Sequence, residues 1–239
     1  MAEEWREPLH RLGNAGTLPE AQAATARLMD VALPGGAAVA SDGADIALAI
    51  TSRSDVQRHR FRAYLLWILV LMRSSVGVWQ AALDSGGDGE VTRAEARNEG
   101  RTIEALTRAA TTVAGMMDDP DPEVRSVAFQ LVGAALQPAK LAGALLIAAA
   151  RSETDELARA CAIASAVVAL ARQWPDATDE EVDWVRDAIR SGTSMIQGRV
   201  RRVVEGHALV GSRQAAASIV AIPLDQLPPE GPFWPVESV

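Results

Sequence analysis

The chain has little cysteine and histidine and none of the common sequence motifs of enzyme reactive centres. Its 239 residues include one cysteine, Cys161, so no intrachain disulfide can form, and the apolar helical pattern around it predicts a buried, unreactive thiol. The three histidines are scattered, without metal-ligand spacing or an H-E-x-x-H motif. The chain also has no glycine-rich loop followed by lysine and no G-x-S-x-G elbow. The sequence therefore favours a protein that is not an enzyme.

Positive charge is also scarce. Lysine and arginine number 23 against 31 acidic residues, which gives a net charge of −8. Because a phosphate-binding surface needs clustered excess cations, this balance argues against nucleic acid as the partner. Two local basic clusters, Arg58–Arg62 and Arg199–Arg202, depart from the trend. We interpret them as sources of ion pairs between repeats; the alternative is contact with a carboxylate- or phosphate-bearing partner.

Long apolar runs are missing as well. The longest, Ala63–Met72, has ten residues, whereas a membrane-spanning helix needs roughly 20. The first residues, Met1–Trp5, lack the basic-then-apolar layout of a secretory signal. We therefore expect a cytoplasmic protein without a membrane span.

Aromatic residues make up only 4% of the chain, although 49% of it is hydrophobic and alanine is abundant. The core must therefore be built from small and aliphatic side chains. Alanine leads the helix-propensity scale and is depleted from strands. The composition thus predicts an all-α fold.

Two segments repeat at an offset of 34 residues, Asp121–Ala128 and Asp155–Ala162, with acid, arginine and alanine in matching places. Such a period is typical of stacked helical hairpins that bury a shared core. Capping boxes are predicted at Thr17 with Glu20 and at Thr178 with Glu181. The helical faces expected in the core are Val124, Val127, Ala128, Leu131, Val132 and Ala135, then Leu141, Leu145 and Leu146, then Ala158, Cys161, Ala162, Ser165, Ala166 and Ala169, and finally Val182, Val185 and Ile189.

The motif Asp121-x-Glu123-Val124-Arg125-x-x-Ala128 is similar to the first-helix signature of HEAT-like (armadillo-type) repeats. The resemblance implies an α-solenoid of antiparallel helix pairs. It also implies that the matched acids and arginines form a structural ladder between repeats; here these would be Asp121, Arg125, Asp155 and Arg159.

The chain divides into three parts on this interpretation. Residues 1–53 form an N-terminal helical cap region, residues 54–221 hold the HEAT-like repeats, and residues 222–239 form a proline-rich extended tail. Within the tail, Phe233–Trp234 is expected to cover the open end of the solenoid, because solenoid ends need capping. Docking on a partner is the alternative.

The segment Asp84–Glu95 resembles a degenerate EF-hand calcium loop. Its expected metal ligands are the carboxylates of Asp84, Asp88 and Glu95, the carbonyl of Glu90, and a water near Thr92.

Two features of this segment argue against calcium binding. Gly86 stands at position 3 of the loop, which removes one ligand, and no second EF-hand follows. Thr92 and Glu95 would instead form an ordinary capping box in an acidic interhelical loop.

We therefore expect a non-enzymatic protein–protein interaction module or adaptor built on a HEAT-like solenoid. A calcium-responsive regulator using Asp84, Asp88, Glu90 and Glu95 is the alternative. HEAT-like folds also include DNA glycosylases, which hold a distorted base between aromatic side chains near an acid. Trp174 and Trp184 with Asp183 or Asp187 would suit that role, but the acidic balance of the chain disfavours it.

Overall fold

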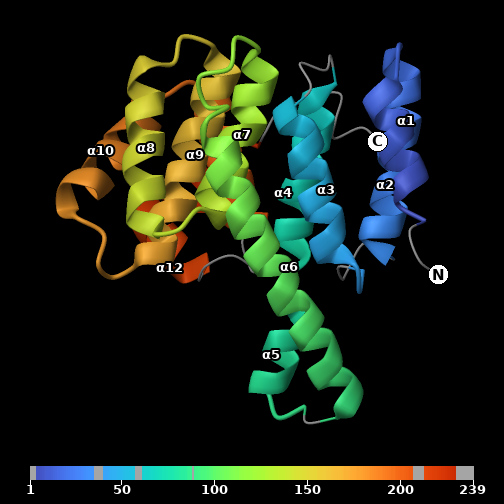
Figure 1. The fold of residues 1–239 in the computed structure, drawn as a ribbon. Coiled ribbons are helices and arrows are strands. Elements are labelled where there is room, and N and C mark those ends of the chain that lie inside the picture. The colour runs from blue at the N-terminus through green and yellow to red at the C-terminus, as the bar shows by residue number, and fades with distance from the viewer. Residues whose placement is uncertain (1–3, 35–39, 57–60, 88, 207–212, 230–239) are drawn as a thin grey trace. The chain divides into compact units, whose positions relative to one another are not determined.

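A computed structural model describes residues 4–34, 40–56, 61–87, 89–206 and 213–229. Helices and connecting loops make up these residues, and no strand occurs among them (Figure 1). The predicted all-α fold is confirmed for this part of the chain. Phe233–Trp234 and three residues of the first basic cluster, 58–60, lie outside it.

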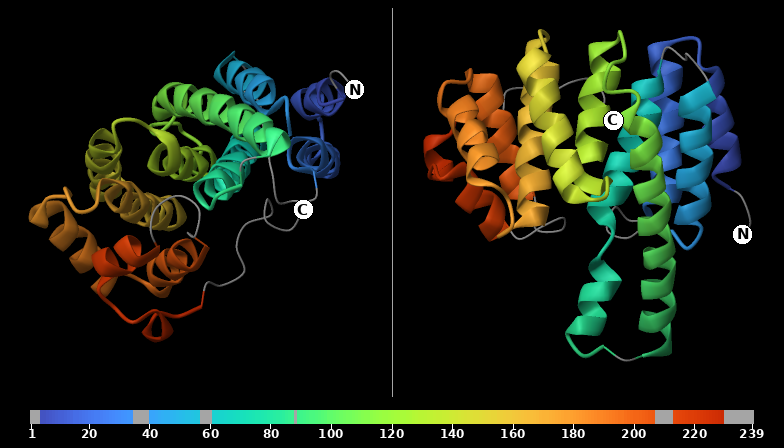
Figure 2. Two further views of the ribbon diagram at one scale, coloured as in Figure 1. Left: turned by 90° about the horizontal axis from the view of Figure 1, so that it is seen from below. Right: turned by 60° about the vertical axis from the view of Figure 1, so that its left-hand side comes forward.

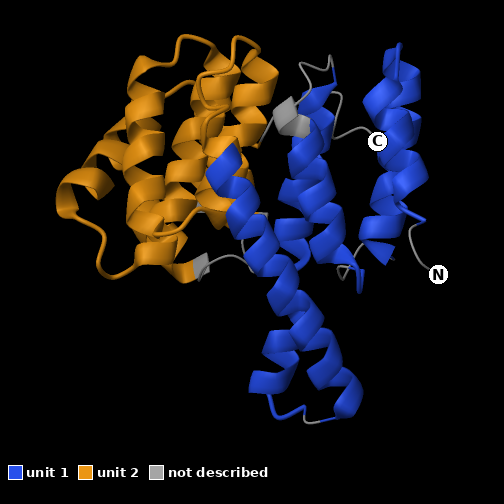
Figure 3. Ribbon diagram, in the orientation of Figure 1, with its two compact units in different colours: residues 1–112, 234–239 blue, residues 113–233 orange. Residues whose placement is uncertain are grey.

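The chain forms two compact units, which meet within one long helix (Figure 3). The first unit extends to Thr112 and the second begins at Val113. The first holds α1 (Arg6–Asn14), α2 (Leu18–Ala32), α3 (Gly43–Val56), α4 (Arg62–Ser75), α5 (Val78–Asp84) and most of α6 (Glu90–Ala114).

In the first unit α2 packs against α1 and α4, and α4 packs against α3. The predicted capping box begins α2, because Thr17 accepts a hydrogen bond from the Glu20 amide while the Glu20 carboxylate accepts one from Thr17. α4 is buried on nearly all sides, with an unbroken buried run from Ala63 to Val70. A helix that is apolar all round is expected in a protein interior.

The stretch Arg62–Asp84 is long and apolar enough to cross a membrane by length and composition alone. The structure divides it at Gly77, whose left-handed φ of 107° separates α4 from α5. α4 has 14 residues and is therefore about 21 Å long, shorter than a hydrocarbon core of about 30 Å. α4 is therefore a buried helix of the protein interior, and α5 is a separate short helix that follows the break at Gly77.

α5 and the first half of α6 form a hairpin that extends beyond the ends of α3 and α4 (Figures 1 and 2). None of the seven residues of α5 is buried. Its first turn is held by Glu99 of α6, whose carboxylate accepts hydrogen bonds from the amides of Val78, Trp79 and Gln80 at 3.0–3.1 Å. The amides at a helix start have no partner within the helix, so a carboxylate here anchors the hairpin at its base.

The second unit holds α7 (Pro122–Ala135), α8 (Ala139–Ser152), α9 (Glu156–Gln173), α10 (Asp179–Arg190), α11 (Ser194–Gly206), α12 (Arg213–Val220) and a short 3₁₀ turn (Leu224–Gln226). α9 is its central helix and packs against all five of the others. Every residue from Ala160 to Ala171 is buried, including the Cys161 thiol, as expected.

Small side chains let the helices of this core approach closely. Gly133 of α7 lies directly against the Ser165 backbone of α9, where a Cβ would come within 2.6 Å of the carbonyl oxygen. The core faces predicted for α7, α9 and α10 are all buried. The capping box of Thr178 with Glu181 is also confirmed. The face predicted for α8 is wrong in part: Leu146 is buried, whereas Leu141 is 47% and Leu145 36% exposed.

Candidate partner-binding surface and predicted polar sites

The structure uses Asp84–Glu95 to end one helix and begin the next. Gly86 has φ +92°, its amide donates to the Leu83 carbonyl at 2.9 Å, and the Gly87 amide donates to the Ala82 carbonyl at 3.0 Å. This pair of bonds is the Schellman motif, which needs a left-handed residue that glycine supplies without strain. Gly86 therefore terminates α5 at position 3 of the loop, where a calcium loop would carry a ligand.

The remaining residues of this segment are placed as follows. Asp84 is exposed and accepts a hydrogen bond from the Gln80 amide group at 3.0 Å. Glu90 begins α6, so its carbonyl lies in the first turn of a helix, and Glu95 is half-buried on the same helix. The predicted capping box at Thr92 is wrong, because α6 begins two residues earlier.

Asp88 lies outside the residues that the structure describes. Within the described ranges, no three His, Cys, Asp or Glu side chains come together as a metal site.

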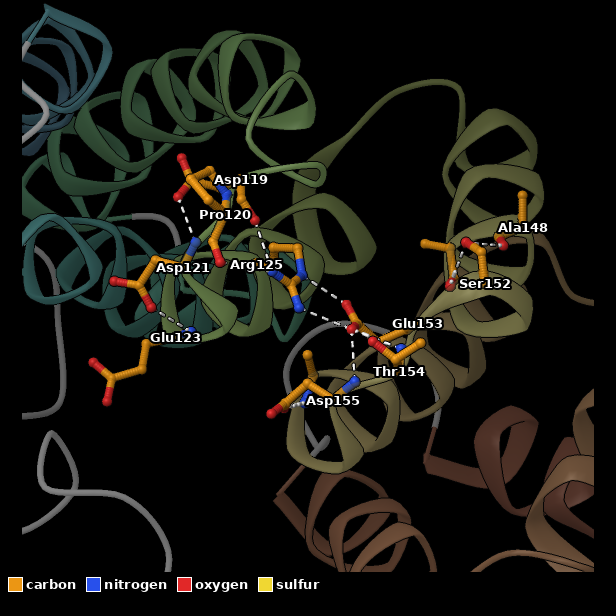
Figure 4. A network of polar contacts seen from close by, with 12 residues as sticks. Asp119, Pro120, Asp121, Glu123, Arg125, Ala148, Ser152, Glu153, Thr154 and Asp155 are labelled. Atoms are coloured by element: carbon orange, nitrogen blue, oxygen red, sulfur yellow. Dashed lines mark hydrogen bonds and ion pairs between the residues drawn. The ribbon is translucent and has the colours of Figure 1, made fainter.

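Arg125 occupies a closed polar network at the start of α7 (Figure 4). Its Nε and Nη2 donate to the two carboxylate oxygens of Glu153 at 2.7 and 2.8 Å. Its Nη1 donates to the carbonyls of Asp119 and Pro120 at 2.7 and 3.2 Å. The same Glu153 carboxylate accepts the amides of Thr154 and Asp155, each at 2.9 Å.

This bidentate pair is mostly buried, with side-chain exposures of 16% for Arg125 and 6% for Glu153. The hydrogen bonds from Arg125 hold the pKa of Glu153 below its usual value, against the opposing effect of burial. The bonds to Glu153 likewise raise the pKa of Arg125. Because each group already has its partners, the network can tie α7 to the loop before α9 but offers no free group for chemistry.

The predicted ladder of equivalent arginines is wrong in its details. Arg125 pairs with Glu153, while Asp121 and Asp155 cap α7 and α9 by accepting the amides of Glu123 and Ala158. The Arg159 side chain is exposed, and no hydrogen bond or ion pair joins it to the described part of the chain.

The residue two positions before the cap of the following helix explains why Arg125 has an acidic partner and Arg159 does not. Glu153 stands there before α9, and Ser191 stands there before α11, whose capping residue is Thr193. Arg159 therefore has no acid to bind.

The acidic residue before the helix cap also repeats at the 34-residue offset. Asp119 accepts the Asp121 amide at 3.0 Å, as Glu153 accepts the Asp155 amide. Sequence reasoning missed this pair, although the spacing is visible in the printed chain.

Two other arginines cap the carboxyl ends of neighbouring helices. Arg172 of α9 donates to the carbonyls of Gly133 and Leu136 at the end of α7, at 2.8 and 3.0 Å. Arg186 of α10 donates to the carbonyls of Ser218 and Ile219 at the end of α12. A guanidinium satisfies carbonyls that have no partner within their own helix. These charges therefore serve the fold.

The residues proposed for a glycosylase site are not gathered around one pocket. Asp183 pairs with Arg186 and Asp187 with Arg190, each within α10. The guanidinium of Arg151 covers the ring of Trp184, 5.1 Å from its centre. Trp174 ends α9 and is 44% exposed.

In the second basic cluster, Arg199 is buried. Arg201 of that cluster bonds to Glu205 within α11 and to the Leu227 carbonyl. The ion pair of Arg201 therefore lies within one helix and not between repeats as predicted, and its other partner is a backbone carbonyl of the same unit.

An apolar stripe runs along the solvent side of α8 and consists of Leu141, Ala144, Leu145 and Ala148, all exposed. We call it the α8 stripe. Trp174 lies near its start, because the neighbouring Gln173 donates to the Ala139 carbonyl at 3.3 Å. Eight large apolar side chains are exposed in the described part of the chain, and three of them, Leu141, Leu145 and Trp174, lie on or beside the first half of α8.

A hollow of about 290 Å³ lies between α8 and α10. Its α8 wall is apolar apart from the guanidinium of Arg151, and its α10 wall is acidic; the lining residues are Ala144, Ile147, Ala148, Arg151, Thr178, Glu180 and Glu181. Asp176, Asp179 and Glu180 are exposed nearby and form no ion pair with described residues. The surface thus combines an uncovered apolar stripe with unpaired negative charge.

A larger hollow of about 770 Å³ lies between α1 and α2. Glu7 and Arg11 on its wall pair with each other. The Glu20 carboxylate accepts the amides of Gly16 and Thr17 at 2.9 and 3.1 Å, and these bonds lower its pKa. Most charged groups here are engaged locally, so the hollow gives no indication of a ligand.

Comparison with protein-family models, with curated proteins and with solved structures finds no match to this chain. The function must therefore be argued from the chain's own surface.

Proposed function

We propose that this protein is a non-enzymatic interaction module built on HEAT-like helical hairpins, in the order α7–α8, α9–α10 and α11–α12. The 34-residue repeat supports the proposal, because an aspartate caps both α7 and α9 and an acidic residue stands two positions before each of these caps. The central position of α9 also supports it, since a middle hairpin must bury both of its sides against neighbours.

The observation that carries the interaction role is the exposed α8 stripe. Ordinary surface helices turn their apolar residues inward and their charged residues outward. α8 does bury Ala142, Leu146 and Ala150, yet it presents a second apolar set to solvent. Exposed apolar surface rimmed by polar residues is a recurrent feature of protein association sites.

The energy available at this surface suits a moderate interaction. Complete burial of a leucine side chain is worth about 1.5–3 kcal/mol. Leu141 and Leu145 still expose 47% and 36% of their surface, so each would contribute roughly 1 kcal/mol when covered. Trp174, 44% exposed, adds a residue type that is enriched among binding hot spots.

The polar groups of this unit support a structural and not a catalytic assignment. Arg125, Arg172 and Arg186 bind carbonyls or a carboxylate of neighbouring helices. Each is thereby committed to holding the helices together. The exposed stripe then remains as the feature that the fold itself does not use.

Affinity purification from the native host, followed by mass spectrometry, tests the proposal. The tagged chain is compared with the double variant Leu141→Glu/Leu145→Glu and with Leu48→Glu as control, since Leu48 is also exposed, at 41%. A protein retained by the wild type and the control but lost by the double variant supports the proposal. Recovery of the same proteins by all three forms, or of none above background, refutes it.

A further inference from the structure

We infer that the α8 stripe and the first turn of α10 together bind an amphipathic helix of another protein, one that carries bulky apolar residues on its inner face and lysines or arginines along one edge. This inference rests on the proposed function and describes its partner by chemistry.

The shape of the surface favours a helix. The exposed residues of the α8 stripe follow the helical spacing i, i+3, i+4 and i+7, and the hollow beside them runs between two helices. This is the helix-in-groove arrangement, in which an apolar helix face lies in a trough between neighbours. Partners that bind as an added strand need a sheet edge, and the described residues contain no strand.

The charge of the surface favours a basic edge. Two carboxylates line the hollow beside the stripe, those of Glu180 and Glu181, and two more are exposed close by in sequence, Asp176 in the segment that leads into α10 and Asp179 in its first turn. The positive end of the α10 dipole stabilises the three in its first turn, but it amounts to only about half an elementary charge. The opposing side chains are Lys140 and Arg151, and Arg151 is stacked on Trp184. The surface therefore keeps a net negative charge that a cationic edge complements.

A second copy of the chain fits this surface less well. α8 is 14 residues long, so its exposed face measures about 21 Å by 10 Å, on the order of 200 Å². A stable interface buries about 800 Å² on each partner. A larger contact between two copies would bring acidic rims together on chains that each carry a net charge of −8.

The test uses an 18-residue synthetic helix, labelled with fluorescein, with leucines at i, i+3, i+4 and i+7 and lysines beside them. Binding to the full chain is followed by fluorescence anisotropy at about 50 mM salt, where charge attraction is weakly screened. We expect a Kd on the order of 10 μM, as suits a small and partly polar contact. Substituting glutamate for the peptide lysines should abolish binding.

Variants of the chain locate the site. Leu145→Glu should weaken binding at least about 10-fold, and Asp176→Asn/Glu180→Gln should weaken it roughly 3- to 10-fold, with a smaller salt dependence. Leu48→Glu and Glu104→Gln, which alter exposed residues of the first unit, should leave the Kd within about 2-fold. Circular dichroism confirms that each variant is folded.

Three results would overturn the inference: no binding of the basic peptide, equal binding to the wild type and Leu145→Glu, or equal binding of the glutamate peptide. Sedimentation showing a dimer that Leu145→Glu dissociates would also overturn it, in favour of a second copy. If the peptide fails while co-purification still depends on Leu141 and Leu145, the inference falls and the interaction role stands. If both fail, both proposals fall.

Discussion

Replacing Gly133 with alanine tests the close contact between α7 and α9 on which the core of the second unit depends. The new Cβ would lie 2.6 Å from the Ser165 carbonyl oxygen and 2.9 Å from the Ser165 Cβ. These atoms belong to the backbone or its first side-chain carbon, so no rotamer change can move them away. α7 and α9 would have to separate by about 0.5 Å before the contact becomes tolerable.

Two terms of opposite sign set the size of the effect. Overpacking a core costs typically about 1–3 kcal/mol, and a clash between two buried helices belongs at the upper end. Alanine is favoured over glycine within a helix by about 1 kcal/mol. We therefore expect Gly133→Ala to lower the free energy of unfolding by about 2 kcal/mol.

Urea denaturation followed by circular dichroism measures the change, with two glycines as controls. Gly100 in α6 has nothing within 4 Å of its Cβ position, so Gly100→Ala should raise stability by up to about 1 kcal/mol. At Gly143 the Cβ would meet the end of the flexible Gln173 side chain at 2.9 Å and Leu170 Cδ2 at an ordinary 3.5 Å, so Gly143→Ala should change stability by less than about 0.5 kcal/mol. If Gly133→Ala equals the wild type or exceeds it, the described α7–α9 contact is incorrect.

Three further predictions concern the polar groups. Glu153→Gln should cost about 2 kcal/mol at neutral pH, because it removes a charged hydrogen-bond partner of Arg125. Folding lowers the pKa of Glu153, so its stabilisation is complete above the unfolded value of about 4.3 and is lost as pH falls through the folded pKa. Unfolding curves of wild type and variant should thus converge in acid; a constant difference would contradict this. Glu99→Ala should speed amide exchange in α5, with a local loss of about 1 kcal/mol, while protection in α9 stays unchanged; exchange that is unaltered in α5 would show that Glu99 does not hold it. Calorimetry on chelator-stripped protein should give no heat at millimolar calcium, because Gly86 ends α5 where a ligand is needed; saturable heat that disappears in Asp84→Asn would favour the calcium-responsive alternative.

The buried faces of the second unit could be predicted because their helices follow a strict 3.6-residue apolar period. The faces predicted from Val124 to Ala135 and from Ala158 to Ala169 are buried, but burial extends beyond them, because every residue from Ala160 to Ala171 is buried and α9 has no exposed side there. α8 could not be assigned in this way, since leucines or alanines occur on most of its sides. Which of them is covered depends on the positions of neighbouring helices, so Leu141 and Leu145 were placed wrongly.

The polar contacts were harder to predict, because they join residues far apart in the chain. Glu99 lies 21 residues from Val78, and Arg172 lies 39 residues from Gly133. Their partners are backbone amides or carbonyls at helix ends, which carry no signal in the sequence. Gly86 already departs from the EF-hand pattern in the sequence, but its left-handed φ at the end of α5 depends on where the preceding helix stops.

Site-specific photo-crosslinking in the native host tests the central claim, that the α8 stripe is a binding surface, most directly. The amino acid p-benzoyl-L-phenylalanine is placed at position 145, and at position 48 as a control of similar exposure. We predict a discrete protein adduct from position 145 that position 48 does not give. Irradiation that yields no adduct at position 145, or the same adducts from both positions, would contradict the account.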